Sequence, residues 1–272
     1  MRDGATVVVG FDGSDDAARA ADWAAEVARE RGATVHLVHA LALPPIPLFD
    51  HHGWTVAELL DRHEAEMRVR LDAECARLAA RGVAVSVHLR RWLPVETLLE
   101  HAAKVAAGLV VVGRHGAGAS HLLLGSVSAA VARGAPQPVA VVRGARQTAP
   151  PRKALLAVDG SAAARQAAAA LARWAPAAEV LAVHVRTPES DDLPDGDALR
   201  GWLTRAGLTG DRCRPLVAEG PVAAALLALA ESEGADLIAA GRRGLSVWQT
   251  LLVGGVSEKL LQLAPCPLLL AH

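Results

Sequence analysis

Short apolar runs alternate with longer amphipathic stretches along the chain. The run Leu109–Val112 contains no polar side chain, which is typical of a strand buried on both faces of a parallel sheet. The stretches between the runs carry helix signals: Ser14, followed by Asp15 and Asp16, suits an N-cap and the positive end of a helix dipole. The predicted strands of the first half cover residues 6–10, 34–40, 83–89, 109–112 and 138–143. Strands separated by helices in this way predict an α/β fold with an open, doubly wound parallel sheet.

The same landmarks occur a second time in the same order. The Asp-Gly-Ser motif at Asp12 returns at Asp159, and a strand histidine, His39, returns as His184. The predicted strands of the second half cover residues 154–158, 180–185, 213–217, 237–241 and 268–271. We therefore interpret the chain as an internal duplication of two Rossmann-like domains, residues 1–146 and 151–272, joined by a short linker that contains two prolines. The region between strands two and three is shorter in the second half, so we expect a shortened helix there.

Composition narrows the class of protein. With 272 residues, of which 52% are hydrophobic, each half can bury a core of its own. The net charge of -1 argues against broad electrostatic attraction to nucleic acid or to an anionic membrane surface. Cys75, Cys213 and Cys266 lie far apart and fit a reducing cytosol. No apolar stretch approaches the roughly 20 residues of a membrane span. We therefore expect a cytoplasmic protein without a nucleic-acid or membrane partner.

A candidate binding site lies where the first and fourth strands end. In a doubly wound sheet, ligands bind at the carboxyl ends of the strands, where the connections change sides. The first strand ends at Asp12 and the fourth at Gly113, which is followed by Gly116. Gly125 and Ser128 then precede a new helical period, so amides and hydroxyls gather at a helix N-terminus and predict an anion site. A mononucleotide fits this arrangement, with its phosphates on the loop amides and Asp12 near a ribose hydroxyl or a magnesium ion.

Each candidate residue also has a plain structural interpretation. Asp12 and Asp159 precede glycine, and Asp-Gly is a common turn pair. His39 and His184 lie within strands and are typical of satisfied core residues, and His115 is typical of a solvated loop. The histidines do not follow the spacing of a known metal site, so we expect no metal held by protein ligands alone.

Other nucleotide and catalytic motifs are missing from the sequence. Neither glycine loop contains a lysine, which excludes the P-loop pattern Gly-x4-Gly-Lys-Ser/Thr. The chain has no Gly-x-Ser-x-Gly elbow of the kind that presents a nucleophilic serine. Neither loop carries an obvious water-activating base. We therefore expect no dedicated catalysis and, at most, weak hydrolysis of a bound nucleotide.

The Asp-Gly-Ser strand end, followed downstream by Gly-x2-Gly and then by Gly-Ser, resembles the ATP-binding class of universal stress proteins. The duplication resembles the tandem form of that family, and the resemblance covers nearly the whole chain. It implies a parallel sheet of strand order 3-2-1-4-5 in each half, with ATP and magnesium bound in the crevice and a regulatory role in the stress response. It also implies pairing through the last strand, here between the two halves as an internal pseudo-dimer, with a homodimer also open. The protein partner is unknown.

The resemblance assigns binding residues in both halves. On the adenosine side it places Gly10, Asp12, Ala40, Ala157, Asp159 and Val185. In the first phosphate loop it places Gly113, Arg114, Gly116, Gly125, Ser126, Val127 and Ser128. In the second phosphate loop it places Gly241, Arg242, Gly244, Gly254, Gly255, Val256 and Ser257.

Both loops depart from the family pattern, each in a different way. Eight residues separate Gly116 from Gly125, one fewer than the family spacing, and the second loop has Gly255 where a hydroxyl is expected. The backbone freedom of the Gly-Ala-Gly-Ala stretch should absorb the missing residue of the first loop. The missing hydroxyl of the second loop removes one hydrogen bond, which is worth about 0.5–1.5 kcal/mol, so we expect neither departure to abolish binding by itself. We predict two sites of unequal affinity. Two alternatives stay open: a slow ATPase or phosphotransferase, and an interaction scaffold whose nucleotide sites have decayed.

Overall fold

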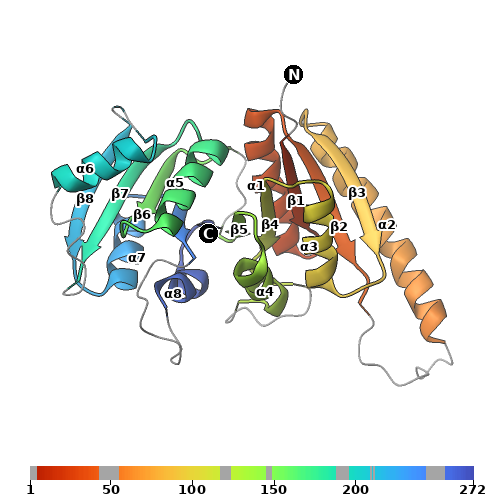
Figure 1. Cartoon of the computed structure of the whole chain (residues 1–272). Helices are drawn as coiled ribbons and strands as arrows, with labels where there is room; N and C mark the ends of the chain where they lie inside the picture. Colours follow the sequence, from red (N-terminus) through yellow and green to blue (C-terminus); the bar gives the residue numbers. More distant parts are fainter. Residues whose placement is uncertain are drawn as a thin grey trace. The chain divides into compact units, whose positions relative to one another are not determined.

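The structure is a computed structural model, and it describes residues 5–42, 55–116, 124–144, 149–187, 196–208, 210, 212–242 and 255–272 (Figure 1). The strands are β1 (Thr6–Gly10), β2 (Thr34–Ala40), β3 (Ala84–Arg90), β4 (Leu109–Gly113), β5 (Val139–Val142), β6 (Lys153–Ala157), β7 (Glu179–Arg186), β8 (Cys213–Glu219), β9 (Leu237–Gly241) and β10 (Leu268–Ala271). The helices are α1 (Asp15–Arg31), α2 (Val56–Ala79), α3 (Pro94–Lys104), α4 (Ser126–Gly134), α5 (Ala162–Trp174), α6 (Gly196–Arg205), α7 (Val222–Ser232) and α8 (Val256–Leu263). The expected alternation of strands and helices is confirmed.

The chain divides into two compact units that meet in sequence between Val131 and Ala132. Unit 1 holds β1 to β4 and the start of α4, and unit 2 holds β5 to β10. This division counts β5, the last strand of the first repeat, with the second repeat, because β5 pairs with β10. The repeat boundary near residue 146 stays a prediction about the sequence.

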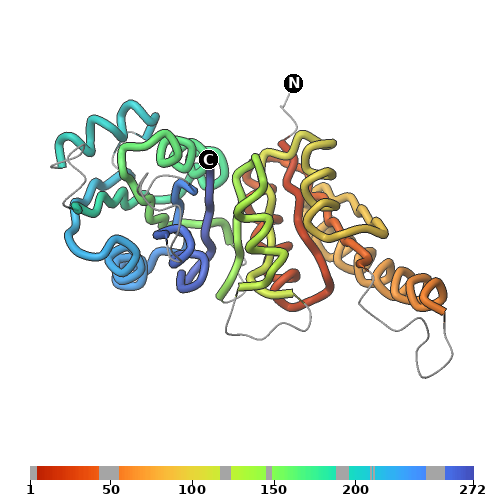
Figure 2. Tube along the Cα trace, turned by 60° about the horizontal axis from the view of Figure 1, so that its bottom comes forward, coloured from red at the N-terminus to blue at the C-terminus, as the bar shows by residue number. Residues whose placement is uncertain are grey.

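In unit 1, the strand order is β3-β2-β1-β4 and every pairing is parallel. Successive connections run outward from β1 to β3 and then return to β4, so the right-handed crossover rule places α1 and α2 on one face and α3 on the other. Helices lie on both faces of the sheet in Figures 1 and 2. The direction changes between β1 and β4, where Val9 pairs with Val111. Asp12 and Gly113, at the ends of these neighbouring strands, therefore share one edge of the sheet.

Unit 2 repeats this plan with one additional pairing. The order from β8 to β10 is β8-β7-β6-β9-β10, which is 3-2-1-4-5 for the second repeat. β5 pairs with β10 in antiparallel orientation, so the last strands of the two repeats pair as expected. The helix between β7 and β8, α6, has 10 residues, whereas α2 has 24, which confirms the shortened helix.

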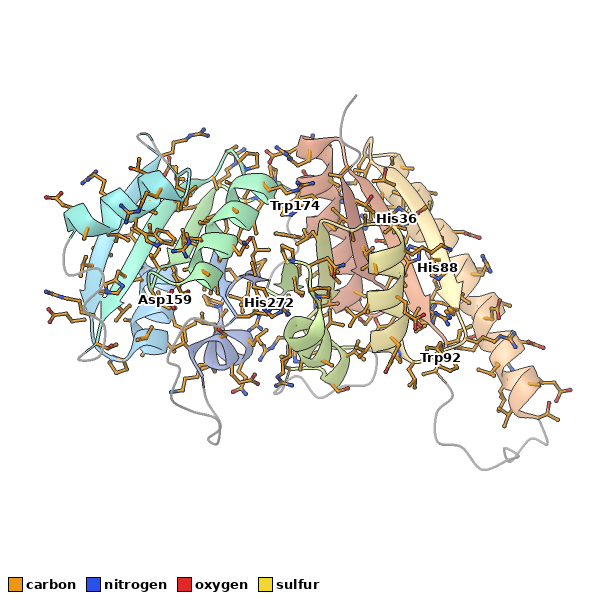
Figure 3. The ribbon with its side chains drawn as sticks, in the orientation of Figure 1. His36, His88, Trp92, Asp159, Trp174 and His272 are labelled. Carbon is orange, nitrogen blue, oxygen red and sulfur yellow. The ribbon has the colours of Figure 1, made fainter. Side chains whose placement is uncertain are left out.

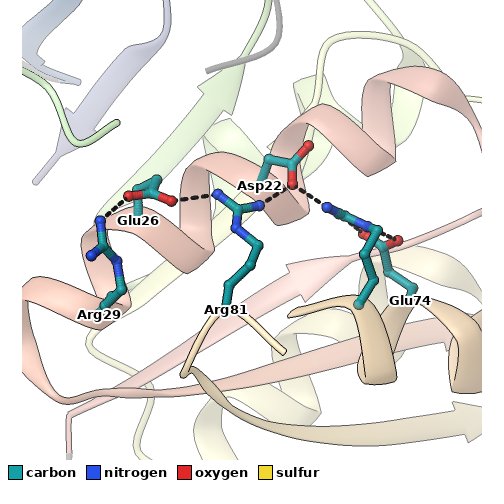
Figure 4. Close-up of polar contacts among 6 residues, drawn as sticks. Asp22, Glu26, Arg29, Glu74 and Arg81 are labelled. Carbon is teal, nitrogen blue, oxygen red and sulfur yellow. Dashed lines mark hydrogen bonds and ion pairs between the residues drawn. The ribbon is translucent and has the colours of Figure 1, made fainter. Parts of the chain in front are cut away.

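A buried ion network fixes α2 on α1 (Figure 4). Asp22 and Glu26 lie one turn apart on α1, and their side chains are only 1% and 4% exposed. Arg81 forms an ion pair with both carboxylates, and the Nη1 atom of Arg77 donates to Asp22 Oδ1 at 2.7 Å. Glu74 completes the network by pairing with Arg77. Buried carboxylates are tolerated because cations and hydrogen bonds compensate them, and this requirement fixes how the two helices align.

Candidate nucleotide site

The site begins with the Asp-Gly-Ser turn at the end of β1. Asp12 Oδ1 accepts a hydrogen bond from the Ser14 amide at 3.0 Å, and Ser14 Oγ accepts from the Ala17 amide at 3.1 Å. Gly13 has φ +79°, which favours glycine. Asp12 therefore stabilises the turn, as expected for an Asp-Gly pair. Because its Oδ1 atom is fixed by the Ser14 amide, the direction of its Oδ2 atom is fixed too.

The second oxygen of Asp12 lies against the glycine loop after β4. A Cβ atom added to Gly116 would come within 2.7 Å of Asp12 Oδ2. A Cβ atom added to Gly113 would come within 2.7 Å of the carbonyl carbon of Asp16. Real Cβ contacts are not this short, so Gly113 allows a close approach to the backbone of α1, and Gly116 leaves room for the Asp12 carboxylate. The structure thus brings Asp12, Gly113 and Gly116 together, as the sequence predicted.

Asp16 holds the glycine loop by two hydrogen bonds. Its Oδ2 atom accepts from the backbone amide of His115 at 2.9 Å and lies 2.9 Å from the ring atom Nδ1 of the same residue. Burial of Asp16 acts to raise its pKa, but the hydrogen bonds from Arg19 and His115 outweigh that effect and hold the pKa below its usual value. Asp16 therefore stays ionised beside the loop.

The expectation that His115 is a solvated loop residue is wrong. Its side chain is only 9% exposed because the ring turns inward to Asp16. The sequence placed Asp16 in the first turn of α1, where an acidic residue suits the helix dipole. That local signal does not reveal a partner 99 positions further along the chain.

The N-terminus of α4 closes the loop on its other side. The Gly125 amide donates to the carbonyl of Arg114 at 2.9 Å. Ser128 Oγ donates to the carbonyl of Gly113 at 2.6 Å. The Ser128 hydroxyl therefore donates its one proton to a protein acceptor. This hydrogen bond links α4 to the end of β4. Ser257 repeats the contact in unit 2, where its Oγ donates to the Gly241 carbonyl at 2.9 Å.

These elements enclose a cavity of about 270 Å³ in unit 1. Its lining includes these predicted residues: Gly10, Asp12, Ala40, Gly113, Gly116, Gly125, Ser126, Val127 and Ser128. Its lining also includes residues that the sequence did not single out as ligands: Phe11, Ala17, Val38, His39, Pro94, Leu98 and His115. Arg114 is not among the described residues that line the cavity, and its carbonyl is the acceptor for Gly125. The volume lies just below the range of about 300–1,000 Å³ for small-molecule sites.

The strand histidines are buried, as their plain interpretation predicted. The Nδ1 atom of His39 donates to the Phe11 carbonyl at 2.7 Å, because a carbonyl can only accept. His184 makes the equivalent bond to the Val158 carbonyl at 2.9 Å. Burial is the main cause that lowers the pKa of His39. Both rings tie the end of the second strand to the end of the first strand in their own repeat.

The corresponding cavity of unit 2 is smaller, about 50 Å³. Of the predicted residues, its described lining contains Ala157, Asp159, Val185 and Gly241. Asp159, labelled in Figure 3, repeats the turn of Asp12, since its Oδ1 atom accepts from the Ser161 amide at 3.0 Å. Gly255 is the N-cap of α8, the helix that begins at Val256, and it makes no side-chain capping bond. Gly244 and Gly254 lie outside the described residues.

Arg242 differs from its predicted role as a phosphate ligand. Its Nη1 atom donates to the Ala132 carbonyl at 2.8 Å, and its Nη2 atom donates to the Ala135 carbonyl. Carbonyl groups at a helix C-terminus attract cations because of the helix dipole. The guanidinium group is thus engaged by the end of α4 and does not face the unit 2 cavity.

Two features typical of other kinds of site are absent from the residues that the structure describes. Within this part of the chain, no group of three or more His, Cys, Asp or Glu side chains is arranged to hold a metal ion. None of the helices that the structure describes combines the length and the apolar character that a membrane crossing needs.

Two copies of a parallel-sheet unit, each with an Asp-Gly-Ser turn beside the glycine that ends its fourth strand, define a duplicated Rossmann-like α/β protein. The sequence profile of the universal stress protein family matches residues 5–143 and 151–272. The chain therefore belongs to the universal stress protein family and carries two copies of its domain.

The chain is similar over nearly its whole length to a curated relative and to a solved structure, and over about half of its length to another solved structure. A universal stress protein of Mycobacterium tuberculosis is 31% identical and covers 98% of this chain and 96% of its own. The solved structure of a universal stress protein from Archaeoglobus fulgidus has a TM-score of 0.76 at 20% identity and covers 99% of both chains, which shows the shared fold. A universal stress protein solved in complex with cAMP is 32% identical over 51% of this chain and 96% of its own, with a TM-score of 0.40.

Proposed function

We propose that this universal stress protein binds ATP in the cavity of unit 1 and acts as a nucleotide-dependent regulator rather than as an enzyme. The observation that carries the proposal is the convergence of the Asp12 carboxylate, the glycine loop and the N-terminus of α4 on one cavity. A carboxylate and a set of backbone amides that line the same cavity suit a ligand with a hydroxylated sugar and an anionic tail.

Each part of the nucleotide has a matching part of the cavity. Ala129 is the residue of α4 whose amide bonds back to the Gly125 carbonyl, so the helix leaves the amides of residues 126–128 for an external acceptor. These amides and the positive end of the helix dipole attract the phosphates. Asp12 lines the same space from the end of the neighbouring strand β1 and suits a ribose hydroxyl. Ala40, at the end of β2, borders the apolar part that remains for the base.

Magnesium would enter together with the nucleotide. Mg²⁺ in nucleotide sites is held by one or two carboxylates together with the substrate phosphates and water. Asp12 is the carboxylate among the described residues that line the cavity. Its Oδ2 atom lies beside Gly116 of the glycine loop. The donor set therefore fits a nucleotide-borne ion and does not fit a resident metal.

The two units differ in how well they fit ATP. Unit 1 has the larger cavity and the Asp16–His115 contact on its glycine loop. In unit 2, Ala163 occupies the place of Asp16, because a Cβ atom added to Gly241 would meet the Ala163 carbonyl carbon at 2.8 Å. We therefore assign the tighter site to unit 1.

The test uses the full chain. Nucleotide released from freshly purified, denatured protein is identified by mass spectrometry, and titration calorimetry measures ATP binding to nucleotide-free protein. Gly116→Ala should weaken binding at least tenfold, because the added methyl group meets Asp12 Oδ2 at 2.7 Å. Gly196→Ala is the matched control, since a Cβ atom there meets no atom within 4 Å. Absence of both co-purified nucleotide and measurable ATP binding in the wild type would refute the proposal.

A further inference from the structure

Asp16 has a contact pattern that its place in a helix first turn does not explain. A single oxygen, Oδ2, meets both the backbone amide and the ring Nδ1 atom of His115 at 2.9 Å. The other oxygen, Oδ1, pairs with Arg19 on the same helix. One carboxylate thus ties α1 to the loop between Gly113 and Gly116.

The contact with Asp16 occupies one backbone amide of the loop, that of His115. The His115 amide lies between the two loop glycines, where a phosphate acceptor would otherwise be expected. Because the His115 amide donates a hydrogen bond to Asp16, this N–H group points into the protein. Charge-assisted hydrogen bonds are about twice as strong as neutral ones, so this contact resists displacement by a ligand. The loop is therefore held in one shape before any nucleotide enters.

The two repeats provide an internal comparison. Gly113 packs on the backbone of Asp16 at 2.7 Å, and Gly241 packs on the backbone of Ala163 at 2.8 Å, both measured from an added Cβ atom. The backbone approach is the same in the two units, but only unit 1 has a carboxylate at this point. Packing alone therefore does not require the carboxylate of Asp16.

We infer that Asp16 is a positioning residue for phosphate binding: through His115 it pre-forms the glycine loop of unit 1 for the triphosphate of a nucleoside triphosphate. This inference rests on the proposed function. Preformed loops bind more tightly because the cost of ordering them is not subtracted from the binding energy. Asp16 acts through His115 and the loop, and it is not among the described residues that line the cavity.

The test compares three variants of the full chain. Asp16→Ala removes the acceptor and should weaken ATP binding about tenfold, which corresponds to ~1.4 kcal/mol. Asp16→Asn retains an oxygen that accepts from His115 and should stay within about threefold of wild type, or ~0.7 kcal/mol. Asp15→Ala is the matched control: it removes an equal charge from the same helix turn, but the side chain of Asp15 is exposed.

Adenosine is the second ligand of the test, because it has no phosphate. Asp16→Ala should leave the affinity for adenosine unchanged while the affinity for ATP falls. An equal loss for both ligands would mean that the variant damages the whole site, and an equal effect of Asp15→Ala on ATP would mean that only charge matters. Either result overturns the inference.

A measurement without nucleotide separates this inference from the proposed function. Amide hydrogen exchange at His115, followed by NMR in the free protein, should be slow in wild type and in Asp16→Asn and at least tenfold faster in Asp16→Ala. Equal exchange rates would overturn the positioning role whether or not ATP binds. Slow exchange in a wild-type protein that fails to bind ATP would contradict the proposed function and would also remove the phosphate role of Asp16.

Discussion

Acidification should destabilise unit 1 through three clustered histidines. His36 lies on β2, His88 on β3 and His101 on α3, and Figure 3 shows His36 and His88 on the strands beside that helix. His36 Nδ1 is 3.1 Å from His101 Nε2, and the rings of His88 and His101 stack with their centroids 4.2 Å apart. Lys104 and Arg90 add positive charge nearby. A proton added to any ring in this group therefore places a positive charge near Lys104, Arg90 or another protonated histidine.

The sign and size of the effect follow from the pKa of His101. Burial, followed by the charges of His88, His36 and Lys104, lowers this pKa from 6.5 to about 4. The unfolded chain takes up a proton near pH 6.5, whereas the folded chain resists it until about pH 4. The contribution of His101 to the free energy of unfolding is thus fully present above pH 6.5 and is lost as the pH falls towards 4. The full difference equals ~3 kcal/mol, and solvent screening reduces it to about 1–2 kcal/mol.

The perturbation that isolates this effect is His101→Leu. Urea unfolding of wild type and variant is compared at pH 7.5 and pH 5.0, with a fluorescence probe attached to unit 1. Wild type should lose about 1–2 kcal/mol more than the variant between the two pH values, because the variant has one fewer group to protonate. His272→Gln is the control, since it removes an exposed histidine of unit 2.

Two results would refute the reasoning. The first is an equal loss of stability in wild type and His101→Leu over this pH range. The second is a stability of wild type that rises as the pH falls, since that sign requires a histidine whose pKa is raised by folding.

Three other predictions concern burial and hydrogen bonding. Asp22→Ala removes one carboxylate from Arg77 and Arg81, which keep Glu74 and Glu26 as partners, and should cost about 1.5–3 kcal/mol in urea unfolding, against under about 0.5 kcal/mol for Arg62→Ala in an exposed pair; similar costs would contradict the buried network. Burial raises the pKa of Cys266 to about 12, so a thiol reagent at pH 8 should not modify it in the folded protein, and labelling detected by peptide mass spectrometry would disprove this. Ser128→Ala should cost about 1 kcal/mol and weaken ATP binding through the loss of one hydrogen bond to the glycine loop, whereas Ser232, an exposed serine outside the site, should tolerate alanine; equal effects would show that the Ser128 bond is unimportant.

The prediction of the fold from the sequence succeeded where the signals are local. The apolar runs identified the strands, and the turn at Asp12 and the glycines of the β4 loop identified the edge of the sheet where the cavity lies. The shorter connection in the second repeat predicted the short helix α6. These signals are local because periodicity and turn chemistry act over a few neighbouring residues.

The tertiary structure decided which partners the polar side chains choose. The sequence could not show that Asp16 accepts a hydrogen bond from His115. It also could not show that Ser128 donates to the Gly113 carbonyl, or that Arg242 donates to a carbonyl at the end of α4. These contacts join residues far apart in the chain, and they depend on the angles at which helices cross the sheet.

The sequence by itself thus determined the duplication and the alternation of strands and helices, since both follow from a repeated pattern of apolar residues, glycine and Asp-Gly-Ser. The strand order was implied by the resemblance to the family, and the site was a prediction from the same motifs. Only the tertiary structure decided that unit 1 has the larger cavity and the held loop. The physical reason is that a hydrogen bond depends on distances of a few tenths of an ångström, which only the packing of the elements around it can set.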